Sequence, residues 1–177
     1  GVRRARDGEE VRTLDGQVRR LDHRDMVIKD GDHAIALAAI MGGEETEVTP
    51  QTTNILLEAA NFEPLTVLRS GERLRMRTES QSRWEKGVDA ELAGAAATYA
   101  TELLVRLAEA RWTGHGEVRA GPVSPPSIAF DPSHTDHVIG LSIPEPEQRN
   151  RLEKLGFGVA ADWTVQTPTW CARDVRR

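Results

Sequence analysis

Residues 77–89 read RTESQSRWEKGVD, and no other stretch of the chain has so particular an order. Its first ten residues include five charged side chains and one tryptophan, and its last three, Gly-Val-Asp, lead into a long helical pattern. The usual explanation is a solvated helix face, because opposite charges three and four residues apart form exposed ion pairs that add little stability. From the residues alone, that explanation is favoured over a functional one.

Composition limits the class of protein. The chain has 177 residues, of which 38% are hydrophobic and 29% charged, so it can build a real core. Its net charge is −5 and basic residues alternate with acidic ones, so it lacks the basic patch that DNA binding needs. The single cysteine, Cys171, excludes an internal disulfide framework and indicates a reducing, cytoplasmic setting. No apolar run approaches the roughly 20 residues of a membrane helix, so we expect no membrane partner.

The pattern up to about residue 61 predicts strands and turns. Segments 2–5, 11–14 and 26–29 are strand candidates, and the Asp-Gly pair at 15–16 is typical of a hairpin turn. The apolar run 34–41 predicts a strand buried on both faces, which Gly42 and Gly43 end. Residues 55–60 predict another apolar strand. Because the chain starts without Met inside a strand pattern, we expect a piece of a longer protein.

Helices are predicted from residue 64 onward. Pro64 suits a first helical position, and Leu65, Leu68 and Leu74 form the apolar side of the helix that follows. Asp89 can cap a long amphipathic helix over about 90–111.

The Pro-rich stretch near residue 121 predicts a linker, followed by a smaller module. Asp131-Pro132 opens a helix that Gly140 closes. Another helix follows Ile143-Pro144, with Leu152 and Leu155 facing inward and Gly156 as its left-handed cap. Residues 157–159 and 164–167 predict a closing hairpin. The fold class is therefore α+β.

Glu58 is the sharpest candidate site residue. It interrupts an otherwise apolar segment, and a carboxylate buried there should be paired, protonated or facing a cavity. From sequence alone, the favoured alternative is that strand alternation places Glu58 on a solvated face. The run Ala38-Ala39-Ile40-Met41-Gly42-Gly43 is a second candidate, because small residues let the backbone approach a ligand closely. A tight turn between buried strands explains it equally well.

Other candidates are weaker. His134 and His137 have helical spacing but no third metal ligand in an obvious position, so a surface pair is favoured. Cys171 is predicted to be an inert thiol.

Three blocks resemble signatures of the phenylalanine–tRNA ligase beta subunit, in the right order and spacing. Residues 77–89 resemble R-T-E-A-S-x-R-F-E-R/K-G-V-D, and residues 41–43 and 56–60 resemble two upstream blocks. In the first block, Gln81 replaces the usual Ser and Trp84 the usual Phe. The resemblance implies that this block shapes the inner surface of its domain and its contact with neighbouring modules. Its matching residues are Arg77, Thr78, Glu79, Arg83 and Glu85.

The resemblance implies a bacterial-type ligase that joins phenylalanine to tRNA-Phe with ATP and Mg²⁺ in the cytoplasm. Two alpha and two beta subunits would assemble, with the aminoacylation centre in alpha. Residues 1–118 would be the later part of a B3/B4 editing domain with a mixed sheet and a long packing helix. Residues 119–126 would be a linker, and 127–177 a truncated B5 domain of the winged-helix kind.

The resemblance also implies a role for this segment in hydrolytic editing of Tyr-tRNA-Phe and in scaffolding. Glu58 would recognise the tyrosine hydroxyl, and Ala38, Ala39 and Met41 would belong to the pocket. Ala39 stands where the family usually has Gly. The family's editing-site His lies upstream, so we expect this fragment alone to be inactive and to bind no cofactor.

Residues 168–175 resemble the block P-S-W-R-x-D-I with one residue more. Asp174 then matches an Asp that binds Mg²⁺ together with acidic residues further downstream. One carboxylate does not make a Mg²⁺ site.

Two other interpretations stay open. A non-catalytic module for tRNA or protein interaction could have kept the fold and lost editing, which Ala39 favours. A free-standing hydrolase for mischarged tRNA is also conceivable, but the second domain argues against it.

Overall fold

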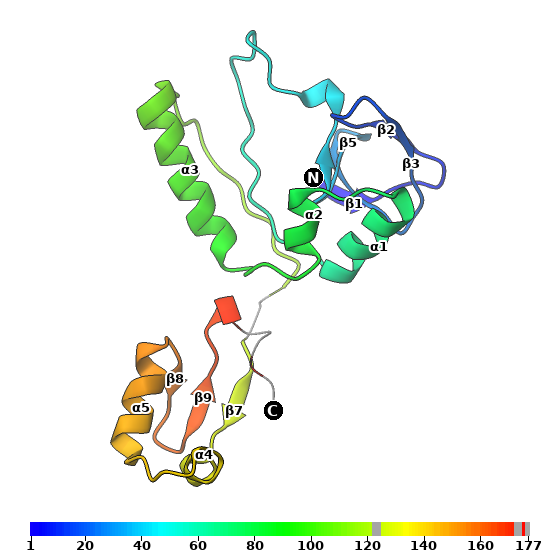
Figure 1. The fold of residues 1–177 in the computed structure, drawn as a ribbon. Coiled ribbons are helices and arrows are strands. Elements are labelled where there is room, and N and C mark those ends of the chain that lie inside the picture. Colours follow the sequence, from blue (N-terminus) through cyan, green and yellow to red (C-terminus); the bar gives the residue numbers. More distant parts are fainter. Residues whose placement is uncertain (122–124, 172–174, 176–177) are drawn as a thin grey trace. The chain divides into compact units, whose positions relative to one another are not determined.

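The structure is a computed structural model that describes residues 1–121, 125–171 and 175. It divides into two compact units, Gly1–Val88 and Asp89–Arg177. Both units combine strands with helices, which confirms the α+β class (Figure 1).

The first unit is built on a four-stranded antiparallel sheet with the order β1-β4-β5-β6. A separate two-stranded sheet pairs β2 with β3, and Gly16 takes a positive φ of 76° in the turn between them. The predicted strands at 2–5, 11–14 and 26–29 and the Asp-Gly turn are thereby confirmed. The strands are β1 (Val2–Arg4), β2 (Glu10–Arg12), β3 (Val18–Arg20), β4 (Met26–Asp30), β5 (His33–Leu37) and β6 (Met41–Gly42).

The apolar run 34–41 is not one strand, so that prediction was wrong. Strand β5 ends at Leu37 and β6 begins at Met41. Between them the chain turns back: the Ile40 amide donates to the Leu37 carbonyl, and Ala39 takes a φ of 60°. Strand β5 is mostly half-buried rather than buried on both faces. A pattern of apolar residues carries no signal for this reversal, because alanine seldom adopts a left-handed backbone.

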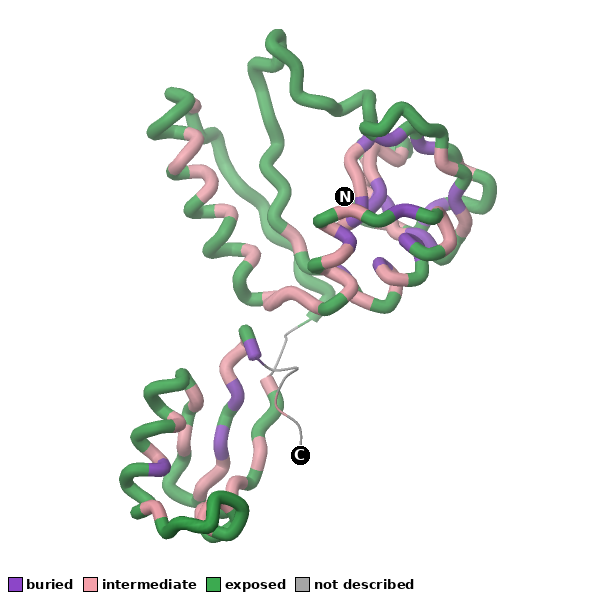
Figure 2. The backbone as a smooth tube through the Cα atoms, viewed as in Figure 1, coloured by how far each residue is buried: buried purple, intermediate pink, exposed green. Residues whose placement is uncertain are grey.

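The predicted strand at 55–60 was also wrong. Residues 52–63 have no regular secondary structure, and the segment up to residue 59 is exposed (Figure 2). Leu56 is 97% exposed. A strand needs a neighbour that satisfies its backbone groups, and none of the strands in the described ranges pairs with this segment.

Two helices follow in the first unit, α1 (Pro64–Leu74) and α2 (Glu79–Trp84), after a short 3₁₀ turn η1 (Glu44–Thr46). Helix α1 starts at Pro64 as predicted, and the Glu63 carboxylate caps it by accepting from the Leu65 and Thr66 amides at 3.0 and 2.6 Å. Its buried face is Val67, Ser70 and Gly71, whereas Leu65 is exposed, contrary to the prediction.

One apolar core joins the sheets to α1. Its fully buried members are Ala5, Val11, Leu21, Val27, Leu37, Ala38, Ile40, Phe62, Val67 and Met76.

The second unit holds the long helix α3 (Leu92–Ala108), close to the predicted range of 90–111. Its N-cap is Glu91 rather than Asp89, whose carboxylate instead accepts from the Glu91 amide at 2.9 Å. None of the α3 residues is fully buried: Leu92, Tyr99 and Leu107 are exposed, and Leu103 and Leu104 are half-buried.

A three-stranded antiparallel sheet of order β7-β9-β8 also lies in this unit, with β7 (Ser127–Ala129), β8 (Gly158–Val159) and β9 (Thr164–Gln166). The predicted hairpin is confirmed as β8 and β9. Strand β7 was not predicted, because three residues after a linker carry too weak a pattern.

Two helices, α4 (Pro132–Ile139) and α5 (Glu145–Lys154), and a 3₁₀ turn η2 (Thr169–Cys171) complete the second unit. As predicted, Asp131 caps α4 and Gly140 ends it with a φ of 76°. Gly156 follows α5 with a φ of 87°. Leu155 is exposed rather than inward, and the buried side chain of α5 is Gln148. Among the helices of the described ranges, none has the length and apolarity that crossing a bilayer requires.

We expect Gly43→Ala to lower the unfolding free energy of the first unit by about 2–3 kcal/mol. A Cβ on Gly43 would lie 2.2 Å from the Ile35 carbonyl oxygen, which is backbone and already accepts from the Gly43 amide at 2.9 Å. The matched control is Gly42→Ala, whose Cβ meets the flexible end of Leu14 at 3.2 Å and should change stability by less than about 1 kcal/mol. Urea unfolding followed through NMR signals of core residues would measure both, and equal losses would contradict the prediction.

The unfolding free energy of the first unit should fall at acidic pH, partly because the Glu9 carboxylate becomes protonated. Both Arg3 Nη atoms donate to Glu9, at 2.8 and 2.6 Å, and the pKa of the Glu9 carboxyl is lowered from 4.5 to about 2. Because the folded-state pKa is depressed, this stabilisation is present above pH 4.5 and lost as the pH falls toward 2.

We therefore expect Glu9→Gln to cost about 1–2 kcal/mol at neutral pH and to approach wild type near pH 2. Glu10→Gln is the control, because Glu10 is the exposed neighbour of Glu9 at the start of β2 and makes no salt bridge within the described residues. Unfolding free energies measured from pH 2 to 7 that fall in parallel for all three proteins would reject the role of Glu9.

Candidate functional site

The first candidate segment is the turn of residues 38–41 between β5 and β6, hereafter the turn segment. Ala38 is buried, and its amide donates to the Met26 carbonyl at 3.0 Å. Ala39 and Met41 are half-buried and pack against the core. The left-handed backbone at Ala39 costs an alanine about 1 kcal/mol, which glycine would not lose. The geometry therefore explains why the sequence resemblance expects glycine at this position.

The second candidate segment comprises residues 58–61, hereafter the Glu58 segment. Glu58 is exposed, as the alternative interpretation of the sequence expected. Desolvation by neighbouring atoms still raises the pKa of its carboxyl, and the amino terminus of Gly1 offsets part of that rise. Within the described residues, Glu58 makes no hydrogen bond or salt bridge. Its carboxylate oxygens are therefore available to a ligand.

Helix α2 and the residues beside it contact both segments. The Thr78 hydroxyl donates to the Ile40 carbonyl of the turn segment at 2.9 Å and accepts from the Gln81 amide at 3.0 Å, which caps α2. Trp84 Nε1 donates to the Ala60 carbonyl of the Glu58 segment at 3.1 Å. No hydrogen bond joins Glu58 itself to the turn segment among the described residues. The two segments are thus connected through α2 rather than directly.

A further hydrogen bond holds the end of the Glu58 segment. The Asn61 side-chain amide donates to the Val88 carbonyl, just beyond α2, at 2.6 Å. Sequence reasoning gave no role to Asn61 or Trp84. The cap at Thr78 had a local signal, since Thr followed by Gln three positions later is typical of a helix start.

The charged residues of the 77–89 block divide into two groups. Glu79 and Arg83 form an exposed pair at 3.7 Å, four residues apart, which fits the solvated face that the sequence favoured. Arg77 pairs with Glu85 at 3.7 Å, and the Glu85 carboxylate also accepts from the Gln81 side-chain Nε2 at 2.6 Å. Only this second group reaches toward the interior, because Glu85 lies next to buried Gln81.

Gln81 seats α2 against α1. It is 2% exposed, and a Cβ on Gly71 would lie 2.6 Å from its Nε2 atom. The absent side chain at Gly71 therefore makes the space that Gln81 fills.

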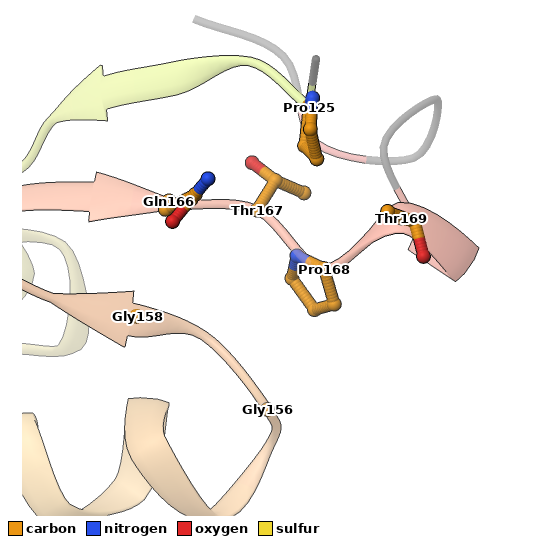
Figure 3. A pocket seen from close by; sticks show the side chains of 7 residues that line it. All are labelled: Pro125, Gly156, Gly158, Gln166, Thr167, Pro168 and Thr169. Carbon is orange, nitrogen blue, oxygen red and sulfur yellow. The ribbon is translucent and has the colours of Figure 1, made fainter. Parts of the chain in front are cut away.

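In the second unit, a hollow of about 210 Å³ opens beside strand β9 (Figure 3). Among the described residues, none of the side chains that line it is ionisable, and its side-chain polar groups come from a glutamine and two threonines. The lining residues are Pro125, Gly156, Gly158, Gln166, Thr167, Pro168 and Thr169. A threonine hydroxyl needs an adjacent general base to act as a nucleophile, and none of these described lining side chains is one.

Metal binding finds no support in the described part of the chain. No group of three or more His, Cys, Asp or Glu residues there could hold an ion, so His134 and His137 have no third ligand among those residues. Asp174, which the sequence resemblance linked to Mg²⁺, lies outside the described residues.

Comparisons with known proteins match the sequence of this chain to a family. The family model of the B3/4 domain matches residues 1–109. The chain is 37% identical over 172 residues to the phenylalanine–tRNA ligase beta subunit of Leifsonia xyli subsp. xyli, covering 96% of this chain and 20% of that protein.

Two further beta subunits of this ligase are similar. That of Moorella thermoacetica is 38% identical over 166 residues, covering 93% of this chain and 21% of the relative. That of Geobacter sulfurreducens is 41% identical over 163 residues, covering 88% of this chain and 20% of the relative. The chain spans about a fifth of the length of these relatives. It belongs to the B3/4 domain family, in the form carried by bacterial-type phenylalanine–tRNA ligase beta subunits.

Proposed function

We propose that this chain is a segment of the beta subunit of a phenylalanine–tRNA ligase and that it contributes to the editing of Tyr-tRNA-Phe. The whole enzyme would attach phenylalanine to tRNA-Phe with ATP and Mg²⁺, in the cytoplasm and together with an alpha subunit. Family membership supports the subunit role. The observation that supports the editing role is the Glu58 carboxylate, which makes no hydrogen bond or salt bridge within the described residues.

Glu58 would select the substrate. Glu58 makes no hydrogen bond or salt bridge with the described residues, so its carboxylate can accept a hydrogen bond from the tyrosine hydroxyl, which phenylalanine lacks. A site that hydrogen-bonds a substrate hydroxyl separates the two amino acids strongly, because the analogue without it leaves polar groups unpaired.

Hydrolysis would use a positioned water rather than a covalent intermediate. The water oxygen attacks the ester carbonyl carbon, the bond to the ribose oxygen breaks, and that oxygen takes up a proton. The backbone groups of the turn segment, around Ala38, Ala39 and Met41, would line the site. The described residues do not fit a Mg²⁺ ion, so no step of this reaction is assigned to one.

The proposed domains are an editing portion at 1–118, a linker at 119–126 and a B5-type module of winged-helix kind at 127–177. The match of the B3/4 family to residues 1–109 supports the first of these. The third, residues 127–177, contains α4, α5 and the sheet β7-β9-β8, which are consistent with a small helix–hairpin module.

A non-catalytic module is the second candidate function. One observation favours it: Ala39 occupies a left-handed position where glycine is usual in the family that the sequence resembles. Such a module would keep the contacts with tRNA or protein and lack hydrolysis.

We expect Glu58→Ala, in the full ligase that carries this segment, to slow hydrolysis of Tyr-tRNA-Phe about 10- to 100-fold. A hydrogen bond to a charged group is worth about 1.5–3 kcal/mol, and each 1.4 kcal/mol is about tenfold in rate. Deacylation of preformed Tyr-tRNA-Phe measures this, with attachment of phenylalanine unchanged. Glu45→Ala, which removes an exposed acid elsewhere in the first unit, is the matched control. Deacylation as fast in Glu58→Ala as in Glu45→Ala would refute the role of Glu58.

Ala39→Gly separates the two candidate functions. Relief of the left-handed strain should stabilise the first unit by about 0.5–1 kcal/mol in either case. If the site works, deacylation of Tyr-tRNA-Phe should stay within about threefold of wild type, whereas a large gain would support the non-catalytic module. Ala38→Gly, at the buried neighbouring position with an ordinary φ, should instead be destabilising.

A further inference from the structure

We infer that helix α2 positions the two sides of the editing site, with Thr78 and Trp84 as the positioning residues. The inference rests on the proposed editing function and adds to it two residues that act through the backbone of the site, at the Ile40 and Ala60 carbonyls. It follows from four observations: two hydrogen bonds, the absence of hydrogen bonds at residues 55–59 within the described part of the chain, and the packing of α2 on α1.

Thr78 holds the turn segment. Its hydroxyl donates to the Ile40 carbonyl at 2.9 Å, and Ile40 lies between Ala39 and Met41, the two half-buried residues proposed to line the site. The same hydroxyl accepts from the Gln81 amide and so caps α2. A hydroxyl can donate and accept at once, so serine can replace Thr78 in both roles and valine in neither.

Trp84 holds the Glu58 segment. Residues 55–59 are exposed and make no hydrogen bond within the described part of the chain. The first hydrogen bond after them is that from Trp84 Nε1 to the Ala60 carbonyl at 3.1 Å. Two residues of chain span at most about 7 Å, so this bond limits where the Glu58 backbone can lie. The bond from Asn61 to Val88 at 2.6 Å adds a second restraint.

The two hydrogen bonds lie at opposite ends of one short helix. Thr78 is the N-cap of α2 and Trp84 is its last residue. Six helical residues extend about 9 Å, so α2 acts as a rigid spacer between the carbonyls of Ile40 and Ala60. Gln81, buried in the space left by Gly71, prevents α2 from shifting on α1.

Trp84 is a property of this chain in particular. The family that residues 77–89 resemble usually has phenylalanine there, and phenylalanine has no N–H group to donate. The indole therefore restrains the Glu58 segment in a way that the usual residue does not.

The test compares conservative and disruptive variants in the assembled ligase that carries this segment. We expect Thr78→Val to lower the rate constant for deacylation of Tyr-tRNA-Phe roughly tenfold or more, because a misplacement of about 1 Å is costly for a positioned reaction. The KM for the mischarged tRNA should change less than about twofold, since the inferred role of Thr78 is to hold the Ile40 carbonyl rather than to bind tRNA. Thr78→Ser should restore the rate to within about threefold of wild type.

Trp84→Phe keeps the aromatic ring and removes only the donor. Its expected result is a loss of roughly three- to tenfold in the preference for Tyr-tRNA-Phe over Phe-tRNA-Phe. Hydrogen–deuterium exchange on the 177-residue chain gives a second measurement that is independent of activity. Thr78→Val should speed exchange at residues 38–41 selectively, and Trp84→Phe at residues 58–61.

The outcomes separate the inference from the proposed function. If wild type deacylates Tyr-tRNA-Phe no faster than Glu58→Ala, the proposed function is wrong. If wild type edits and Thr78→Val and Trp84→Phe match it in rate, preference and exchange, the positioning role is wrong and the function stands. Should Thr78→Val fail to fold, the Trp84→Phe variant decides the question alone.

Discussion

The reversal of the chain between Leu37 and Met41 is the constraint on which the first unit depends. It lets β6 pair with β5, with Leu37 opposite Met41 and Ala36 opposite Gly42. It also brings Gly43 so close to Ile35 that no side chain fits there. The reversal requires a left-handed residue, and Ala39 takes that conformation at a cost of about 1 kcal/mol. Because the turn is held from both strands and by Thr78, the surrounding contacts can maintain this strain.

The turn segment is held in place by α2, and α2 in turn packs on α1, which is bound to the rest of the first unit by an ion pair. Asp25, which is fully buried, pairs with Arg73 near the end of α1 and accepts from the Asp22 amide at 2.9 Å. A buried ion pair adds little net stability, but breaking it is costly, so it fixes the orientation of α1. Helix α1 then presents Gly71 to Gln81 of α2. The candidate site thus rests on a buried charge pair that lies outside it.

Local signals in the sequence predicted local structure well. The Asp-Gly turn, the start of α1 at Pro64, and the α4 helix between Asp131 and Gly140 were all correct, because each depends on residues within a few positions. The predictions for 34–41 and 55–60 failed because an apolar pattern indicates that residues prefer to be buried. It does not indicate whether a neighbouring strand is present to pair with them. Helix α3 is a further example: its apolar residues recur at helical spacing, yet none of them is fully buried.

In the candidate site, too, the sequence predicted individual residues but not the long-range contacts between them. Resemblance to a family pointed to Glu58, Ala38, Ala39 and Met41 and placed Thr78 in a supporting block, but it predicted none of the contacts that hold the two segments. The bonds from Thr78 to Ile40 and from Trp84 to Ala60 join residues 38 and 24 positions apart. Contacts of that range depend on how α1 and α2 pack, and packing is decided by three-dimensional shape rather than by spacing.

Two of the three departures from the usual family residues, Ala39 and Trp84, bear on whether the site is functional. Ala39 adds one methyl group and about 1 kcal/mol of backbone strain, while Trp84 adds a hydrogen bond worth about 0.5–1.5 kcal/mol. The strain at Ala39 and the hydrogen bond of Trp84 change the folding free energy by similar amounts in opposite directions. Ala39 therefore does not imply that the domain is less stable. An alanine has only its Cβ with which to pack, and Ala39 packs against the core. The extra methyl group is therefore accommodated by the core, and Ala39 gives less support to a non-catalytic module than its identity alone suggested.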